Sequence, residues 1–333
     1  MLMKMPPVTV TAVVPHWNRR ELLAALLENL AQQTRPFDEI VVVDNGSTDG
    51  SVELAKQLGA RVIELDRNLG FAAAVNRGIA ATHSDFIAII NNDVTLAPNW
   101  LEVLLAQTAS KEIAFATGKI LSAADPSLLD GAFDEVSRAA CSARCGSGKP
   151  DAPIWNQPRK IRFAPMTAAL FRSEIFQRIG GLDEVFGSYM EDVDFGIRCA
   201  VAGYAGTYVP AAVAYHQGSA TFGRWSADSV WRISRNQVLL AVKHFGAQPR
   251  LPIVIGQALW GFVALRHGCG GAFVRGKLAG LRDKRLLTAK QSGLETTGQL
   301  AAILEASERE IFEVGKQTGF DNYWRAYFWL LRR

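Results

Sequence analysis

The chain has 333 residues, a hydrophobic content of 49% and a formal net charge of +4. This length and apolar content allow one large α/β domain with a smaller appendage, which we expect to fold without disulfides. The four cysteines are too scattered for a disulfide framework and lack the paired spacing of a zinc site, so we expect free thiols in a reducing compartment.

The N-terminal third alternates strand-like and helix-like segments. Apolar runs predict strands at 8–14, 40–43, 61–65 and 85–90. Segments with helical spacing lie between them, at 19–33, after the Asp44–Gly50 turn as far as Leu58, and at 71–81, with Asn18 as the expected N-cap of the first helix. This βαβαβαβ order predicts a mostly parallel sheet with helices on both faces, whose strand ends bind ligands at one edge.

Periodicity is lost between about 121 and 162, where Gly, Ser, Pro, Asp and Cys dominate. A loop of this length inside a compact domain is usually functional or mobile, so we expect a mobile flap. The elements expected after it are helices at 173–179 and 191–202 and strands at 206–209 and 211–215. We therefore expect a catalytic domain over 1–225 and a helical, basic and aromatic extension over 226–333.

Polar side chains gather at three predicted strand ends and at one helix start. They are Pro15-His16-Trp17-Asn18, Asp44-Asn45, Asn91-Asn92-Asp93 and Glu191-Asp192-Val193-Asp194. Each cluster alone has an ordinary explanation, as a turn, a helix cap or acids favoured by a helix dipole. Their order along one sheet edge favours a binding site instead.

This arrangement suits group transfer from a phosphate-linked donor. Asp93 offers the hard oxygen ligand that Mg or Mn prefers, and a divalent cation there would neutralise a diphosphate leaving group. A second carboxylate must take the proton of the attacking hydroxyl. Asp192 is the candidate base, and Glu191 is the alternative.

Seven motifs in this order resemble family 2 glycosyltransferases with the GT-A fold. The motifs are Val10–Asn18, Val42–Gly50, Asn68–Asn76, Asn91–Asp93, Gly180–Asp183, Glu191–Asp194 and His216–Thr221. The resemblance covers about residues 8 to 245 and is strongest to rhamnosyltransferase-like members that build bacterial surface polysaccharides. It implies an inverting transfer of one sugar, with Asp192 as the base.

The resemblance also implies binding roles for individual residues. Pro15, Trp17 and Asp44 would hold the base and ribose of a nucleotide, and Asp93 with His216 would bind Mg or Mn. The other residues expected at the donor are Asn18, Asn45, Asn68, Gly70, Asn76, Asn91 and Asn92, with Ser219, Thr221 and Gly223 near phosphate and Arg235 and Asn236 on a helix near the cleft. Many family members have acids at positions 91 and 92, so the asparagines here predict weaker cation binding unless donor phosphates contribute.

The expected partners are a nucleotide diphosphate sugar donor, with rhamnose as the first choice of sugar, and a glycan or lipid-linked acceptor in cell-wall polysaccharide synthesis. A sugar-phosphate nucleotidylyltransferase is one alternative, but it would need a Gly-rich, Arg-bearing loop where His16-Trp17-Asn18 stands. A catalytically degenerate nucleotide-sugar-binding protein is the other. The asparagines at 91 and 92 favour it, and the full acidic motif at 191–194 argues against it.

The C-terminal segment 251–331 mixes aromatic residues with many Arg and Lys. This mixture predicts either an amphipathic surface on an anionic membrane, or a helical cap or oligomer interface. Its basic excess also suits nucleic acid, but a lipid-linked acceptor favours the membrane, so we expect no nucleic acid. The apolar stretch at 251–265 is shorter than the roughly twenty residues of a spanning helix. We expect a cytoplasmic protein, peripheral on the inner face of the cytoplasmic membrane.

Overall fold

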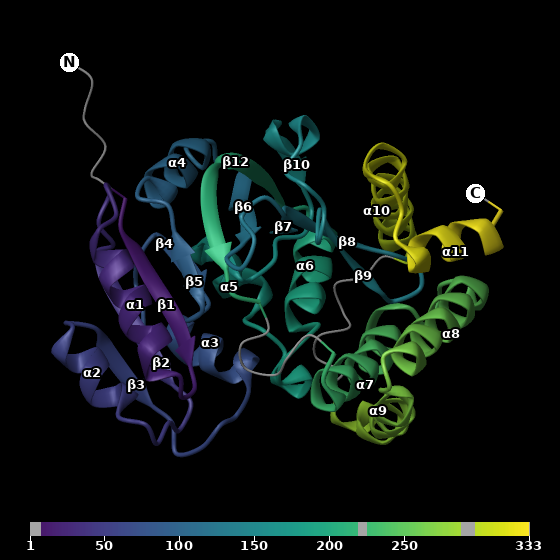
Figure 1. Cartoon of the computed structure of the whole chain (residues 1–333), viewed down its shortest axis with the longest axis horizontal. Coiled ribbons are helices and arrows are strands. Elements are labelled where there is room, and N and C mark those ends of the chain that lie inside the picture. Colours follow the sequence, from purple (N-terminus) through teal and green to yellow (C-terminus); the bar gives the residue numbers. More distant parts are fainter. Residues whose placement is uncertain (1–7, 219–224, 288–296, 333) are drawn as a thin grey trace.

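The computed structural model describes residues 8–218, 225–287 and 297–332. Strands and helices alternate along its first third, as predicted (Figure 1). In chain order these elements are β1 (Val10–His16), α1 (Arg20–Ala31), β2 (Glu39–Asp44), α2 (Ser51–Gln57), β3 (Arg61–Glu64), α3 (Phe71–Ala80), β4 (Phe86–Ile90), β5 (Val94–Leu96) and α4 (Trp100–Gln107).

A second group of elements completes the sheet domain. It comprises β6 (Ile113–Ser122), β7 (Leu129–Gly131), β8 (Phe133–Val136), β9 (Ser142–Cys145), η1 (Pro153–Asn156), β10 (Arg159–Ile161), β11 (Ala168–Arg172), α5 (Ser173–Ile179), η2 (Glu184–Phe186), α6 (Glu191–Val201) and β12 (Ala205–His216). The two strands expected at 206–209 and 211–215 are one strand, because β12 continues through a register shift between Val209 and Val213.

The central sheet has the strand order β10-β12-β6-β11-β4-β1-β2-β3. Strands β4, β1, β2 and β3 are parallel neighbours. Strand β11 is antiparallel to both β4 and β6, and β12 is parallel to β6, so β6 and β12 run in the same direction as β4. The carboxyl ends of β1, β2, β4 and β12 therefore meet at one edge of the sheet.

Helices cover both faces of this sheet, as predicted. On one face, α1, α2 and α4 bury apolar side chains such as Leu23, Ala55 and Trp100 against the strands. On the other face, α3, α5 and α6 do so with side chains such as Val75 and Phe195. These contacts fix the strand ends that carry the polar motifs.

The prediction of a loop without regular structure over 121–162 is wrong. The segment contains β7, η1, β10 and the hairpin of β8 and β9, which are antiparallel to each other. Every residue of β8 is buried, including Asp134 and Glu135. Alternation of buried and exposed residues is therefore lost, which is why the sequence pattern does not indicate a strand. That the segment moves stays a prediction.

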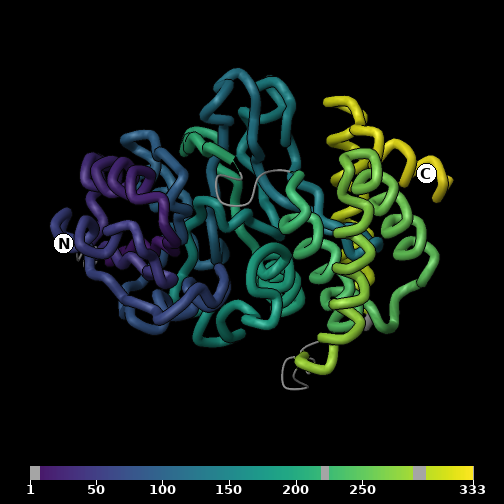
Figure 2. Tube along the Cα trace, turned by 60° about the horizontal axis from the view of Figure 1, so that its bottom comes forward, coloured from purple at the N-terminus to yellow at the C-terminus, as the bar shows by residue number. Residues whose placement is uncertain are grey.

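The described residues after β12 form five α-helices, which lie on the far side of the molecule from the β1–β3 end of the sheet (Figures 1 and 2). They are α7 (Ala227–His244), α8 (Arg250–Arg266), α9 (Gly270–Asp283), α10 (Thr297–Thr318) and α11 (Asn322–Leu330), with a short η3 (Lys284–Leu286) after α9. Within the described residues, none of the helices combines the length and apolar character that a membrane crossing requires.

A buried carboxylate joins the β8–β9 hairpin to α10. The Ser307 hydroxyl donates to Glu135, and its oxygen accepts the N–H of Val136 at 2.7 Å. Burial raises the pKa of Glu135 to about 8. Between its ordinary pKa and this value the folded state holds a proton that the unfolded chain releases, so this group makes folding less favourable as pH rises through that range.

Glu135→Gln is expected to remove this pH-dependent cost, because glutamine stays neutral and still accepts the Ser307 hydroxyl. The variant should gain stability over the native chain as pH rises from 5 to 8, with each unit of pKa difference corresponding to about 1.4 kcal/mol. Urea unfolding at several pH values measures the difference. Glu313→Gln, which replaces an exposed carboxylate on α10, is the control. Equal pH slopes of stability for the native chain and Glu135→Gln would contradict the assignment.

Candidate active site

The side chains of Asp93 and His216 contact each other at the predicted edge of the sheet. Nε2 of His216 lies 3.2 Å from Oδ1 of Asp93, and Nδ1 of the same ring lies 3.0 Å from Oδ2 of Asp130. Both Asp93 and His216 are buried. The Asp130 contact directs Nε2 toward Asp93, so one carboxylate oxygen and one imidazole nitrogen converge on a single point.

This donor set fits a divalent cation that also binds substrate. Within the described part of the chain, no group of three or more His, Cys, Asp or Glu side chains is arranged to hold a metal ion. Mg²⁺ commonly uses one or two carboxylates together with substrate phosphates and water. An imidazole ligand is more compatible with the transition metal Mn²⁺ than with Mg²⁺. Asp93 and His216 would thus supply two ligands, and a diphosphate would supply others.

The His216 ring lies between the carboxylates of Asp93 and Asp130. Burial alone would lower the pKa of His216, but hydrogen bonds and charges from Asp130 and Asp93 raise it to about 9. This raised pKa favours the protonated ring, so binding of a cation at Nε2 would release a proton.

Arg144 connects this cluster to the β8–β9 hairpin. Its guanidinium pairs with Asp130 at 3.2 Å and with Asp134 at 3.4 Å. Its charge also opposes the effect of burial on the pKa of Asp192. The sequence pattern gives no sign of Asp130, Asp134 and Arg144 as site residues, because all three lie in the segment predicted to be a loop, and Asp130 is 86 positions from His216.

The residues after β1 and β2 meet in two facing turns. Asn18 donates its N–H to the Ser47 hydroxyl at 2.7 Å, and its side-chain oxygen accepts the N–H of Thr48 at 3.0 Å. The prediction that Asn18 caps α1 is wrong: the N-cap is Arg19, and it makes no side-chain capping bond. Before this turn, Pro15 is buried and Trp17 is 37% exposed. An exposed indole beside two turns can stack on a planar ring such as a nucleobase.

Asp44 is both a turn former and a free acceptor. Its Oδ2 accepts the N–H of Ser47 at 2.9 Å, which agrees with the Asx-turn explanation. Its Oδ1 is buried and has no partner among the described residues. One oxygen of this carboxylate is therefore available to a ligand hydroxyl.

Three predicted donor-site asparagines use their side chains to hold the framework. Asn45 bonds to the backbone of Leu69 and Gly70, and Asn68 accepts the N–H of Gly70 at 2.9 Å. Gly70 has φ 93°, and a Cβ there would lie 2.9 Å from the carbonyl oxygen of Gly187. Asn76 holds the backbone of Leu182 through both ends of its amide. These residues brace the site, and their direct contact with a donor stays a prediction.

The side chains of the Asn91-Asn92-Asp93 triplet differ in their contacts. The N–H of Asn91 donates to the carbonyl of Thr167, and its side-chain oxygen has no partner within the described residues. Asn92 donates to Nδ1 of His16 at 2.9 Å. His16 belongs to the first of the predicted polar clusters, and this contact places it in the site. Burial lowers the pKa of His16, which favours the neutral ring.

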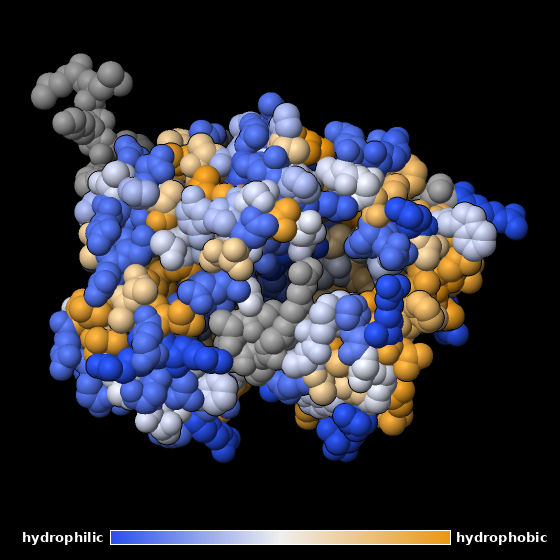
Figure 3. Space-filling view, viewed as in Figure 1, coloured by the Kyte–Doolittle hydropathy of each residue, from blue (hydrophilic) through white to orange (hydrophobic). Residues whose placement is uncertain are grey.

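Buried polar atoms without partners are concentrated at this edge. Six side-chain atoms are of this kind in the described chain, and four of them belong to His16, Asp44, Asn91 and Glu191. Each such group carries a desolvation cost that a ligand could relieve. Figure 3 shows a recess with hydrophilic walls in the middle of the molecule, near the end of β12 in Figure 1.

The acidic motif begins α6 and contains carboxylates in three environments. Burial and the neighbouring charge of Asp192 raise the pKa of Glu191 well above its ordinary value. Burial also raises the pKa of Asp192, whose Oδ1 accepts the N–H of Val193 at 2.8 Å. Asp194 is fully buried in ion pairs with Arg198 and Lys243 and is structural.

Glu191 of the acidic motif and Asp93 both affect the pKa of Tyr189. Burial raises the pKa of Tyr189 to about 12, and the charges of Glu191 and Asp93 contribute to this increase. The structure thus brings the acidic motif, Asp93 and His216 into one region. Ser219, Thr221 and Gly223, which the resemblance places near phosphate, lie outside the described residues.

Asn236 on α7 holds the turn that precedes the acidic motif. Its amide nitrogen donates to the carbonyls of Phe186, Ser188 and Tyr189 at 2.8, 3.0 and 2.7 Å. Arg235 donates to the Asn236 side-chain oxygen at 2.8 Å. The turn needs this support because Gly187, Tyr189 and Met190 all have φ of 70°, a conformation that costs energy in residues other than glycine.

Asn236→Ala is expected to lower turnover about 100-fold, because a misplacement of about 1 Å in catalytic groups has that effect. It should also destabilise the fold, since each buried carbonyl left without a donor costs about 1–3 kcal/mol. Steady-state kinetics and urea unfolding measure the two effects. Ser234→Ala, at a buried position on α7 that accepts from Trp260, is the control and should keep its turnover. Equal turnover in both variants would contradict a positioning role for Asn236.

Sequence comparisons identify the family of the chain. Residues 11–180 match the family described as Glycosyl transferase family 2. The chain is 30% identical over 268 residues to an N-acetylglucosaminyl-diphospho-decaprenol L-rhamnosyltransferase of Mycobacterium tuberculosis, which spans 73% of this chain and 85% of that protein. It is also 30% identical over 311 residues to a pre-mycofactocin glycosyltransferase of the same species, spanning 89% of this chain and 63% of that one.

Solved structures support the fold. Mannosyltransferase PcManGT from Pyrobaculum calidifontis, in complex with GDP-Man and Mn²⁺, has a TM-score of 0.53 at 18% identity and covers 98% of this chain and 90% of its own. GalNAc-T7 with UDP, GalNAc and Mn²⁺ has a TM-score of 0.61 at 14% identity, covering 80% and 56%. The predicted GT-A fold is confirmed. The chain is a glycosyltransferase and belongs to glycosyltransferase family 2.

Proposed function

We propose that this enzyme is an inverting, metal-dependent glycosyltransferase that moves a single sugar from a nucleotide diphosphate donor to a lipid-linked or glycan acceptor in cell-surface polysaccharide synthesis. The observation that carries the proposal is the convergence of Asp93 and His216 at the strand ends, beside unpartnered atoms of Asp44, Asn91 and Glu191. A site of this kind presents ligands for a cation, acceptors for a nucleoside and a carboxylate base together.

On the donor side, Trp17 would stack on the nucleobase and Oδ1 of Asp44 would accept a hydroxyl or N–H of the nucleoside. Asp93 and His216 would hold Mn²⁺ or Mg²⁺ against the diphosphate. A bound cation would supply electrostatic stabilisation of the leaving group. Both structural relatives were solved with Mn²⁺.

On the acceptor side, Asp192 would take the proton of the attacking hydroxyl. The acceptor oxygen would bond to the anomeric carbon as the bond from that carbon to the nucleoside diphosphate breaks, which inverts the configuration. The raised pKa of Asp192 suits this role, because a base is most effective when its pKa lies near the working pH. Glu191 is the alternative base.

The choice of sugar and acceptor follows the relative whose name states both. That protein acts on an N-acetylglucosaminyl-diphospho-decaprenol and transfers L-rhamnose. We therefore propose rhamnose as the first sugar to test and a polyprenyl diphosphate sugar as the first acceptor. The enzyme would then work at the cytoplasmic surface of a membrane.

A screen of nucleotide sugars with Mn²⁺ or Mg²⁺ tests the donor. A donor at 100 times its Kd adds about 2.7 kcal/mol to the free energy of unfolding, which a thermal-denaturation assay detects. The best donor is then incubated with a short polyprenyl diphosphate N-acetylglucosamine, and the product is analysed for mass and anomeric configuration. Metal-dependent donor binding without any transfer would instead favour a degenerate nucleotide-sugar-binding protein, and retention of configuration would exclude the single displacement.

A further inference from the structure

The outer sides of α8 and α9 carry an unusual number of exposed apolar residues. Fifteen large apolar side chains are exposed in the described chain, and eleven of them lie between positions 242 and 330. Those on the outer sides of α8 and α9 are Leu251, Val254, Phe262, Leu265, Val274, Leu278 and Leu281, each more than half exposed. Monomeric proteins rarely leave so much contiguous apolar surface unless something covers it. We call this set the apolar strip.

The apolar strip is shared between two helices that contact each other. On α8 its members recur with helical spacing, and Trp260 on the opposite side donates to Ser234 of α7. On α9, Gly276 and Gly280 lie against the backbone of α7. Helix α9 therefore buries one side against α7, whereas α8 packs against both α7 and α11, and each helix presents its strip residues to solvent. Figure 3 shows apolar residues along the lower right edge, where Figure 1 places α8 and α9.

Positive charge is concentrated on the helices that carry the apolar strip and directly after α9. Residues 250–287 contain seven Lys and Arg and a single acid, Asp283, which pairs with Arg235 and Arg282. The exposed cations without an ion pair among the described residues are Arg250, Arg266, Arg275, Lys284 and Arg285. An apolar centre with a cationic border is complementary to a surface with an apolar interior and anionic headgroups.

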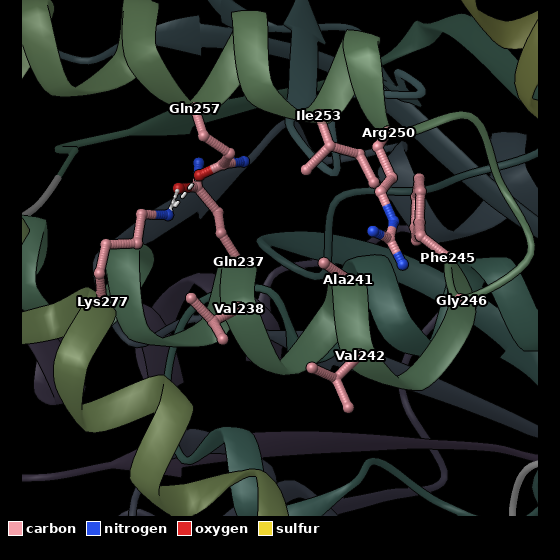
Figure 4. Close-up of a pocket in the computed structure, with 10 residues that line it drawn as sticks. All are labelled: Gln237, Val238, Ala241, Val242, Phe245, Gly246, Arg250, Ile253, Gln257 and Lys277. Atoms are coloured by element: carbon pink, nitrogen blue, oxygen red, sulfur yellow. Dashed lines mark hydrogen bonds between the residues drawn. The ribbon is translucent and has the colours of Figure 1, made fainter.

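A groove of about 340 Å³ lies beside the apolar strip, between α7, α8 and α9 (Figure 4). Its walls are mostly apolar, with Ala241 and Ile253 between Arg250 and Lys277. The Lys277 ammonium donates to the side-chain oxygens of Gln237 and Gln257 and has no carboxylate partner within the described chain. Burial lowers the pKa of Lys277 to about 8. An anionic headgroup in this groove would meet cations that nothing else in the described structure neutralises.

We propose that the apolar strip and its cationic border dock the enzyme on an anionic lipid bilayer, with one acidic lipid in the adjacent groove. A second copy of the chain is a poorer occupant, because two-fold symmetry would bring the same cationic border of both copies together. The benefit of docking rests on the proposed function, since it would bring the cleft to a lipid-linked acceptor. The docking itself is tested without any sugar.

Flotation with vesicles of phosphatidylglycerol and phosphatidylcholine tests the proposal, with pure phosphatidylcholine vesicles for comparison. The native chain should float with the anionic vesicles and lose binding as salt rises. Phe262→Asp should weaken binding about tenfold or more, since it removes one buried aromatic side chain and adds a repelled charge. Arg250→Gln should weaken binding to anionic vesicles about fivefold. Leu58→Asp, an exposed apolar site at the end of α2, is the matched control and should float like the native chain.

The outcomes are distinguishable. No flotation of the native chain, or equal flotation of Phe262→Asp, would overturn the proposal. A dimer seen by light scattering would also overturn the proposal, if Phe262→Asp dissociates it and neither the native chain nor any variant binds vesicles. Asp192→Asn should float like the native chain, so failure of docking and failure of the proposed transfer are seen separately. Because Phe262 is 65% exposed, its replacement should leave the unfolding temperature nearly unchanged, and this is checked on each variant.

Discussion

Asp192→Asn is expected to lower the rate of sugar transfer by about two to four orders of magnitude, the usual contribution of a general base. Donor binding should change little, because the asparagine oxygen can still accept the N–H of Val193 that now fixes the carboxylate. Transfer is measured with radiolabelled donor at saturating acceptor. Donor affinity is measured by calorimetry on the same preparation.

The pH dependence separates a base from a merely structural acid. Burial raises the pKa of Asp192, and Arg144 opposes this increase. A base works only when deprotonated, so kcat/KM of the native enzyme should fall as pH falls through the raised pKa of Asp192. The residual activity of Asp192→Asn should lose this dependence. Unchanged turnover in this variant would remove Asp192 as the base.

Glu191→Gln is the matched comparison. The pKa of Glu191 is raised well above its ordinary value by burial and by Asp192, which favours the protonated form of Glu191. Glutamine resembles that protonated form in shape and charge. We expect a smaller loss than for Asp192→Asn, and the opposite ranking would make Glu191 the base.

Much of the sheet could be predicted because its elements carry strong local patterns. The strands at β1 and β4 are continuous apolar runs, and α5 begins and ends at the predicted residues. Right-handed connections then put the ends of β1, β2 and β4 at one edge. Asp44 and Asp93 could therefore be assigned to a common site before any contact was known.

The remaining parts of the site depend on contacts distant in sequence. Each residue of β8 is buried, and Asp134 pairs there with Arg144. A local pattern shows such a segment as polar and irregular. Asp130 belongs to the site because it contacts His216, and Asn236 because it donates to carbonyls about 50 positions earlier. The position of Asn18 just before a helical pattern predicts an N-cap. Its side-chain oxygen instead accepts the N–H of Thr48 in the facing turn.

Asp93→Ala is expected to weaken binding of a nucleoside diphosphate at least about 100-fold in the presence of Mn²⁺, while binding of the matching nucleoside changes little. Loss of a residue that only supports a metal ligand typically costs 10–100-fold in metal affinity, and loss of a ligand should cost more. Asp93 is the only acid of the triplet, because Asn91 and Asn92 carry no charge. It is one of the two proposed protein ligands of the cation, and His216 is the other. Calorimetry with thymidine or uridine diphosphate and with the free nucleosides measures both affinities.

Asp130→Asn provides the graded comparison that identifies the cause. Asp130 contacts His216 through Nδ1, on the side of the ring away from Asp93, so its replacement should weaken Mn²⁺ binding 10–100-fold, less than Asp93→Ala. Electron paramagnetic resonance of free Mn²⁺ reports this affinity without any turnover. Chelation of the metal should reduce diphosphate binding by the native chain to the level of Asp93→Ala, because both changes remove the same bridge between protein and phosphate. Equal losses for nucleoside and diphosphate in Asp93→Ala would show instead that Asp93 shapes the whole pocket, and the cation would then have to be held elsewhere.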